Sequence, residues 1–125
     1  MENQIQKIKT DFSYYLGSWT NSYEKARVIG AFRLYEENGQ LMIHITGSET
    51  GFYPGNWGSQ VVKSHSYAPD TNDVVAFQTR FEMGDMEAFL AMNENKGLLI
   101  IAGYFTFKDE DERSNCFVRE FFFKI

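Results

Sequence analysis

The stretch Gly17-Ser18-Trp19 decides how the rest of this chain is interpreted. It follows a short amphipathic segment and precedes about one hundred residues in which apolar and polar side chains alternate. An indole on the first strand of such a chain is expected to fill the floor of a small closed β-barrel. A barrel with a filled floor is a cup, and a cup of this size can hold one small molecule.

Strand periodicity and turn residues predict the barrel. Asn38-Gly39 between two alternating runs is a strong hairpin signal, and Val75 and Phe77 share one face of a clearly half-buried strand. The expected strands cover a short segment around Trp19 and residues 27–36, 40–47, 59–67, 74–83, 86–92, 98–107 and 114–124. Short loops join them in order, and pairing of the last strand with the first removes exposed edges. The sequence therefore predicts an all-β fold, an eight-stranded antiparallel up-and-down barrel.

The N-terminal segment has the pattern of a helix. Apolar side chains recur at spacings of three and four at Ile5, Ile8, Phe12 and Tyr15. This spacing predicts a helix of about three turns within residues 1–16 that caps one end of the barrel formed by residues 17–125. With 125 residues, the chain is expected to form a single domain, residues 1–125.

Composition excludes several classes of function. The net charge is −5 without a basic stripe, which argues against nucleic-acid binding. The single cysteine, Cys116, cannot form an intramolecular disulfide, and the N-terminus lacks a signal-peptide pattern. The longest apolar stretch, residues 98–102, is much shorter than a membrane span. We therefore expect a cytoplasmic protein without a membrane partner.

Gly17-x-Trp19 on the first strand, eight meandering strands and a basic residue on the last strand resemble the calycin superfamily, which includes lipocalins, fatty-acid-binding proteins and avidins. The resemblance implies that Trp19 packs across the barrel base and that Arg119 lies over it, as a structural pair. Trp19-Thr20-Asn21 is similar to the Trp-x-Asn of avidins, which implies that Asn21 belongs to the polar end of a ligand pocket. The later tryptophans of avidins have no counterpart, so biotin is not expected.

Three further stretches, residues 16–21, 39–47 and 55–58, resemble landmarks of small calycin-like proteins of bacteria. This resemblance would cover nearly the whole chain. It implies the barrel fold but no particular activity.

The only two histidines, His44 and His65, are expected on neighbouring strands. Each could be a polar hook that bonds a ligand inside the cup, or a surface residue. No carboxylate or thiolate stands at ligand spacing from them, so no metal site is predicted.

The long connection over residues 48–58 contains Phe52, Tyr53 and Trp57 among three glycines. It is expected to form a lid over the open end, or alternatively a loop that these rings attach to the barrel. Phe77 and Tyr104 complete the predicted ligand site. Glu120 is expected to face solvent, Cys116 is not expected to act as a nucleophile, and residues 109–112 are expected to form a solvated turn.

Three classes of function fit these observations. The leading hypothesis is binding of a small, largely apolar molecule inside the cup, without a cofactor. The alternative is a cofactor-free cyclase or isomerase that acts on a hydrophobic natural-product intermediate. The third is an interaction protein whose interior is filled by phenylalanine and whose barrel wall forms a homodimer. A filled interior favours the third class, and paired acid and base groups favour the enzyme.

Overall fold

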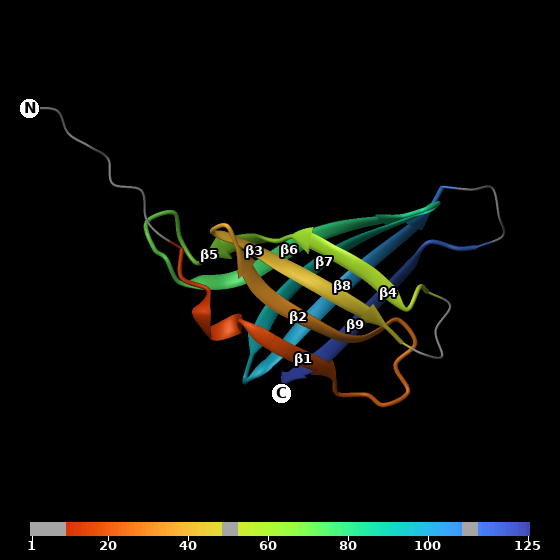
Figure 1. Ribbon diagram of the computed structural model, residues 1–125, viewed down its shortest axis with the longest axis horizontal. Helices are drawn as coiled ribbons and strands as arrows, with labels where there is room; N and C mark the ends of the chain where they lie inside the picture. Colours follow the sequence, from red (N-terminus) through yellow and green to blue (C-terminus); the bar gives the residue numbers. More distant parts are fainter. Residues whose placement is uncertain (1–9, 49–52, 109–112) are drawn as a thin grey trace, which may run out of the picture.

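The computed structural model describes residues 10–48, 53–108 and 113–125. These residues form an antiparallel, nearly closed β-barrel (Figure 1). Its elements are η1 (Ser13–Tyr15), β1 (Gly17–Asn21), β2 (Ile29–Glu37), β3 (Gln40–Gly47), β4 (Asn56–Val61), β5 (Lys63–Ser66), β6 (Val74–Met83), β7 (Met86–Asn95), β8 (Leu98–Phe107) and β9 (Cys116–Lys124). The all-β, up-and-down prediction is confirmed, but the predicted count of eight strands is wrong.

The hairpin between β2 and β3 forms where Asn38-Gly39 predicted it. Both residues have positive φ angles, 53° and 79°, which the tight turn of a twisted hairpin requires. Glu37 pairs with Gln40 directly beside the turn, and the register continues to Ala31 opposite Thr46, after which it shifts and places Ile29 opposite Gly47. Local turn chemistry therefore sets this half of the sheet.

The extra strand arises where the predicted strand over residues 59–67 breaks at Val62. Val62 is buried, and its N–H donates to the Leu41 carbonyl at 2.8 Å, the last bond of the pairing with β3 before Lys63 pairs with Gln78 on β6. The sheet order runs from β4 through β1 and β9 to β5, so β4 and β5 are its two ends. Thr79 on β6 donates its hydroxyl to the Val61 carbonyl at 2.9 Å, which links β6 to β4 across the seam between the two ends of the sheet.

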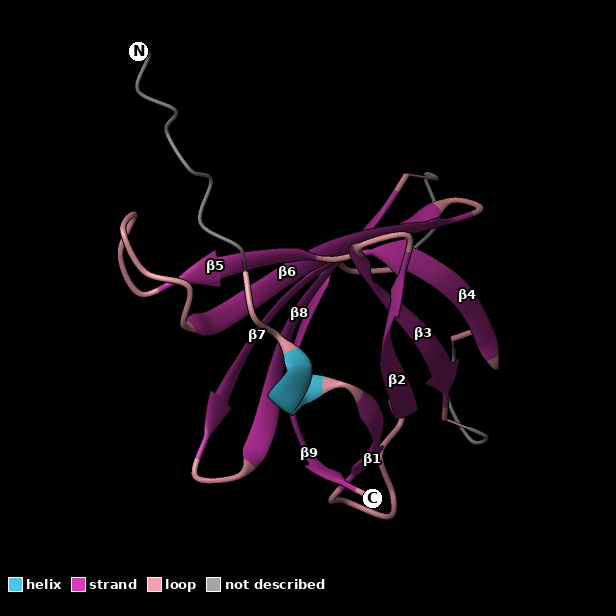
Figure 2. Ribbon diagram, turned by 60° about the vertical axis from the view of Figure 1, so that its left-hand side comes forward, coloured by secondary structure: helices cyan, strands magenta, loops and turns pink. Residues whose placement is uncertain are grey.

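A 3-10 turn stands in place of the predicted N-terminal helix. Within the described residues, the segment before β1 contains only η1, and Figure 2 shows this turn across the near end of the barrel. Ile5 and Ile8, on which the helix prediction also rested, lie outside the described residues. We call the end that η1 covers the floor.

Trp19 fills the floor. Its side chain is fully buried and stacks on Phe32 with ring centroids 6.1 Å apart. The indole N–H donates to the Tyr15 carbonyl at 3.0 Å, and the Tyr15 hydroxyl donates to the Val74 carbonyl at 2.9 Å. These two bonds connect β1 to β6 across the floor.

The cation over Trp19 is Lys124, not Arg119. The Lys124 ammonium lies 5.9 Å from the indole centroid and donates to the Tyr14 carbonyl at 2.7 Å. Arg119 is exposed on the outer face of β9, with its guanidinium 5.4 Å from the Phe121 ring. The inward-facing residues of β9 are the even-numbered ones, such as the fully buried Phe122, so Arg119 points away from the floor.

Aromatic rings occupy the barrel interior from the floor upward. The ring of Phe77 lies 4.7 Å from that of Tyr15, and the ring of Phe122 lies 4.9 Å from that of Phe32. Nearer the other end, Trp57 packs edge-on against Phe81 and Phe105 at 5.6 and 6.0 Å. Among the described residues, no helix is long and apolar enough to cross a membrane.

We expect Trp19→Ala to lower the free energy of unfolding by about 3–5 kcal/mol, because it empties a large, fully buried aromatic site and removes the bond to Tyr15. Denaturant unfolding followed by circular dichroism measures the change. A loss of less than about 1 kcal/mol would contradict the role of the indole as the floor.

A double-mutant cycle identifies the cation that contacts the indole. We expect Trp19→Ala and Lys124→Met to couple by about 0.5 kcal/mol, the scale of an exposed cation–π contact. Arg119→Met is the matched control and should combine additively with Trp19→Ala. Coupling to Arg119 instead would contradict the observed register of β9.

Candidate functional site

The barrel has an open end opposite the floor, which we call the mouth. Residues 22–28 between β1 and β2, residues 53–55 before β4, and the adjoining ends of β8 and β9 surround it (Figure 1). Two adjoining cavities open there, with volumes of about 420 and 430 Å³. Both are lined by Arg27, Val28 and Val118. We refer to them as the mouth cavities.

Tyr53 separates the first mouth cavity from the aromatic interior. Its ring centroid lies 5.0 Å from that of Phe105 and 6.5 Å from that of Trp57. The segment reaches this position because the Gly47 N–H donates to the Gly55 carbonyl at 2.8 Å. A side chain at Gly47 would collide with the Pro54 carbonyl, so only glycine allows this close approach.

The Tyr53 phenol is a hydrogen-bonding group with little tendency to ionise. Burial raises the pKa of Tyr53 to about 12, with further contributions from the charge of Cys116 and a hydrogen bond to its side chain. The positive charge of nearby Arg27 lowers the pKa of Tyr53 and so partly opposes this shift. The phenol therefore stays neutral at physiological pH and can hydrogen-bond a ligand at the mouth.

Glu120 supplies a half-buried carboxylate beside the second mouth cavity. Its Oε2 accepts from the Asn21 side-chain amide at 3.1 Å, and its Oε1 accepts from the Ile29 N–H at 3.3 Å. Burial raises the pKa of Glu120, while these two hydrogen bonds partly oppose the shift. The prediction that Glu120 faces solvent is wrong, because it shares the inward face of β9 with Val118 and Phe122.

Cationic residues line both mouth cavities. Lys25, Arg27 and Arg119 line the second mouth cavity, and Arg113 lines the first. Arg113 forms an ion pair with Asp85 at 2.6 Å. Among the described residues that line the two cavities, cationic side chains therefore outnumber carboxylates.

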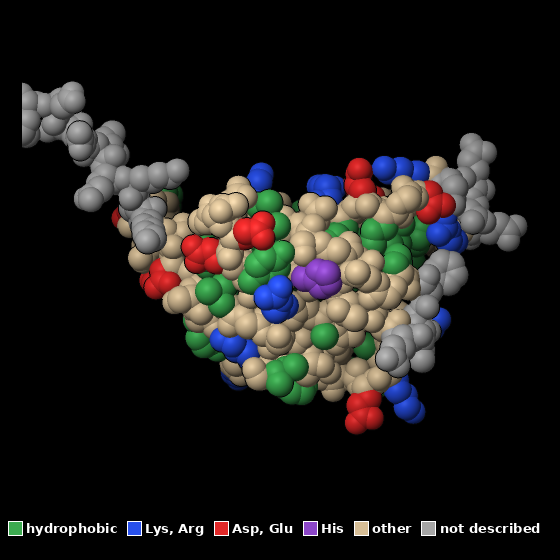
Figure 3. Space-filling view, viewed as in Figure 1, with side chains coloured by type: hydrophobic (Ala, Val, Ile, Leu, Met, Phe, Trp, Pro, Cys, Tyr) green, Lys and Arg blue, Asp and Glu red, His purple; other side chains and the backbone are tan. Residues whose placement is uncertain are grey.

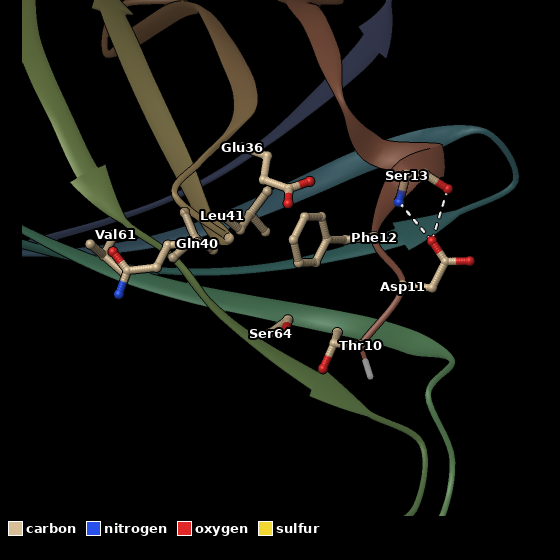
Figure 4. Close-up of a pocket in the computed structure, with 11 residues that line it drawn as sticks. Thr10, Asp11, Phe12, Ser13, Glu36, Gln40, Leu41, Val61 and Ser64 are labelled. Atoms are coloured by element: carbon tan, nitrogen blue, oxygen red, sulfur yellow. Dashed lines mark hydrogen bonds between the residues drawn. The ribbon is translucent and has the colours of Figure 1, made fainter. Parts of the chain in front are cut away.

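A larger cavity, of about 740 Å³, follows the seam between β4 and β5 (Figure 4). The Phe12 ring points into it between Glu36 and Leu41, from the segment that precedes η1. The Asp11 carboxylate accepts bonds from the Ser13 N–H and hydroxyl, at 3.1 and 2.8 Å. We select the mouth as the candidate site despite its smaller volume, because the pKa-shifted Tyr53 and Glu120 are there.

The structure separates the residues that the sequence grouped into one ligand site. Asn21 and Tyr53 are at the mouth. Trp57 is nearly buried beneath Tyr53, because β4 begins at Asn56, three residues earlier than predicted. Phe77 is buried in the floor half of the interior, whereas Tyr104 is 52% exposed on the outer face of β8. These last two side chains therefore lie apart from the mouth cavities.

The two histidines are also apart. His44 lies on the outer face of β3, where its Nδ1 is 3.0 Å from the Ser59 hydroxyl. His65 is exposed on β5, where its Nε2 is 2.8 Å from the Gln78 side-chain nitrogen. The predicted neighbourhood of the two strands fails because the break at Val62 places them on opposite sides of the seam.

Sequence reasoning missed Arg27, Val118 and Glu120 as mouth residues. The available signal was the alternation along β9, since Val118 and Glu120 share the parity of Phe122. In the described part of the chain, no group of three or more His, Cys, Asp and Glu side chains is placed to hold a metal ion. No protein-family model matches this chain, and neither a curated protein nor a solved structure matches it significantly.

The raised pKa of Glu120 predicts a pH dependence of stability. The folded protein holds this proton more tightly than the unfolded chain, so the stabilisation is complete below the ordinary pKa of 4.5 and is lost as pH rises through the folded-state value. We expect the free energy of unfolding to fall over this window relative to that of Glu120→Gln. Denaturant titrations of both proteins from about pH 4 to 8 measure the difference. A constant difference would contradict the prediction.

Proposed function

We propose that this protein is a calycin-like binding protein that holds one small, largely apolar molecule at its mouth. The observation that carries the proposal is the pair of adjoining mouth cavities, which contain a neutral phenol and a half-buried carboxylate. Each volume falls within the range of about 300–1,000 Å³ that is usual for small-molecule sites. The proposed ligand contacts are Tyr53, Val118 and the Asn21–Glu120 pair.

The lining supports a ligand with an apolar body and a polar end. Val28, Phe107 and Val118 supply apolar surface, and the Tyr53 ring covers the packed interior below. Burial of such a body is favourable at about 25 cal/mol per Å². The Tyr53 hydroxyl then provides a directional hydrogen bond that selects one orientation. Asn21, whose amide nitrogen donates to Ile29 and Glu120, holds the Glu120 carboxylate in place.

A cofactor-free isomerase or cyclase is the second candidate. It is favoured by Glu120, whose raised pKa makes the carboxyl a suitable proton donor or acceptor, and by the influence of that charge on Tyr53. Such a reaction conserves mass and needs no metal. For either function we propose a cytoplasmic location.

We expect an apolar fluorescent probe, such as an anilinonaphthalene sulfonate, to bind the native protein at one site with a larger effect on Trp57 than on Trp19. Trp57 lies directly beneath Tyr53, whereas Trp19 is in the floor. Trp57→Phe should therefore remove most of the change in tryptophan emission. Probe binding only under partly denaturing conditions would contradict the proposal.

Two variants distinguish the mouth from the seam. Val118→Phe fills both mouth cavities and should weaken probe binding at least about tenfold, equivalent to 1.4 kcal/mol. Gln40→Phe fills the seam cavity and is the matched control, with no expected change. The reverse result would place the site at the seam. Circular dichroism establishes that both variants remain folded.

The enzyme is separated from the binder by Glu120→Gln. The protein is incubated with a metabolite extract, and the products are analysed by chromatography and mass spectrometry. If the protein only binds its ligand, no compound should be converted into another of equal mass. A conversion that the wild type performs and Glu120→Gln loses, with probe affinity retained, would establish the second candidate in place of the first.

A further inference from the structure

Five aromatic side chains lie on the outer face of β7, β8 and β9: Phe89, Tyr104, Phe117, Phe121 and Phe123. We call this surface the aromatic wall. Tyr104 and Phe117 are more than half exposed, and the last two are 37% and 45% exposed. Hydrophobic groups on the face over β2, β3 and β4 are instead scattered among polar ones (Figure 3). A continuous apolar surface of this kind marks a contact with another molecule.

One row of the wall is an aromatic ridge. Phe89 is directly opposite Tyr104 on the next strand, and Tyr104 is opposite Phe117. Their ring centroids are 6.3 and 5.0 Å apart, so the three rings form a continuous line across three strands.

The next outward-facing row forms a trough. This row lies two residues along each strand from the ridge. In it Ala91 is opposite Ala102, and Ala102 is opposite Arg119. The two methyl groups are much shorter than the rings of the ridge, and the Arg119 side chain closes the trough on β9. The row beyond it consists of Asn93, the buried Ile100 and Phe121, so exposed rings resume only on β9, at Phe121 and Phe123.

The ridge and the trough are complementary to each other under a twofold rotation. An axis in the interface, perpendicular to the strands and midway between the two rows, places each ridge in the trough of a second copy. Tyr104 then lies over Ala102 of that copy, and Phe117 lies over its Arg119. Arginine over an aromatic ring is favourable, and an isologous contact needs such self-complementarity.

We propose that the aromatic wall is the interface of a weak, twofold-symmetric dimer of this chain. Charge supports the second copy as the occupant, because the ridge and trough rows carry Arg80 and Arg119, and the carboxylate that borders them, Glu87, is already paired with Arg80 at 2.7 Å. Two chains of net charge −5 can therefore meet here without bringing acidic groups together. From strand spacing, the wall covers roughly 300–400 Å². Stable complexes bury about 800 Å² per partner, so the dimer is concentration-dependent.

Sedimentation equilibrium of the full chain, from about 10 μM to 1 mM, tests the proposal. The wild type should show a monomer–dimer equilibrium. Ala102→Trp fills the trough and should raise the dissociation constant at least about tenfold, although it adds apolar surface. Thr46→Trp adds the same side chain to the exposed face of β3 and should leave the constant unchanged. Phe117→Ser, which shortens the ridge, provides a second variant that should also weaken the dimer.

Several results would overturn the proposal. A wild type that stays monomeric at every concentration has no such interface. Dimerisation by Ala102→Trp as strong as that of the wild type would indicate non-specific hydrophobic association. Loss of the dimer in Val61→Lys would place the contact at the β4 edge. A monomer that sediments with phosphatidylcholine vesicles would assign the wall to a lipid surface.

Discussion

The barrel depends on two hydrogen bonds in series across its floor, from the Trp19 indole to Tyr15 and from the Tyr15 hydroxyl to Val74. β1 is hydrogen-bonded only to β2 and β9 within the sheet, so its ladder cannot fix its distance from β6. Tyr15 supplies that fixed distance. Because both donors are removed from water, each would carry a desolvation cost if it lost its acceptor. The indole therefore has one position, and the aromatic interior packs upward from it to Tyr53.

The seam is the second constraint on the architecture. A sheet that closed completely would pair β4 with β5, but these strands are consecutive and joined at Val62, which turns inward. Closure instead relies on Thr79, whose hydroxyl reaches the Val61 carbonyl. Because the ladder is incomplete, a large cavity remains along the seam. Because aromatic rings fill the interior, the polar groups Tyr53 and Glu120 lie at the mouth. A filled interior is also the feature that the sequence analysis associated with an interaction protein, one whose barrel wall forms a homodimer.

Local signals in the sequence predicted the strands well, and long-range geometry accounts for the errors. The Asn38-Gly39 turn and the alternation of β6 from Phe77 onward depend only on neighbouring residues, so they could be predicted. Val75, expected on the same face as Phe77, is instead exposed, because the register shifts at this end of the strand. The partner of Trp19 could not, because β9 has phenylalanines on both faces and its alternation does not reveal which face is inside. Residues 59–67 contain no glycine or proline, so nothing local indicated the break at Val62. The mouth residues could therefore not be predicted either, since the inward position of Glu120 depends on the register of β9.

The pairing of β1 with β9 joins the first strand of the sheet to the last, with the Ile125 N–H bonded to the Ser18 carbonyl at 2.9 Å. Every other pair in the sheet connects strands that follow each other along the chain. During synthesis on a ribosome, β1 therefore has an unpaired edge until β9 emerges. Contacts of such long sequence separation form late and slow the folding of β proteins. Both the protection of this edge and the hydrogen bonds of Glu120 to Asn21 and Ile29 therefore form only after β9 has been synthesised.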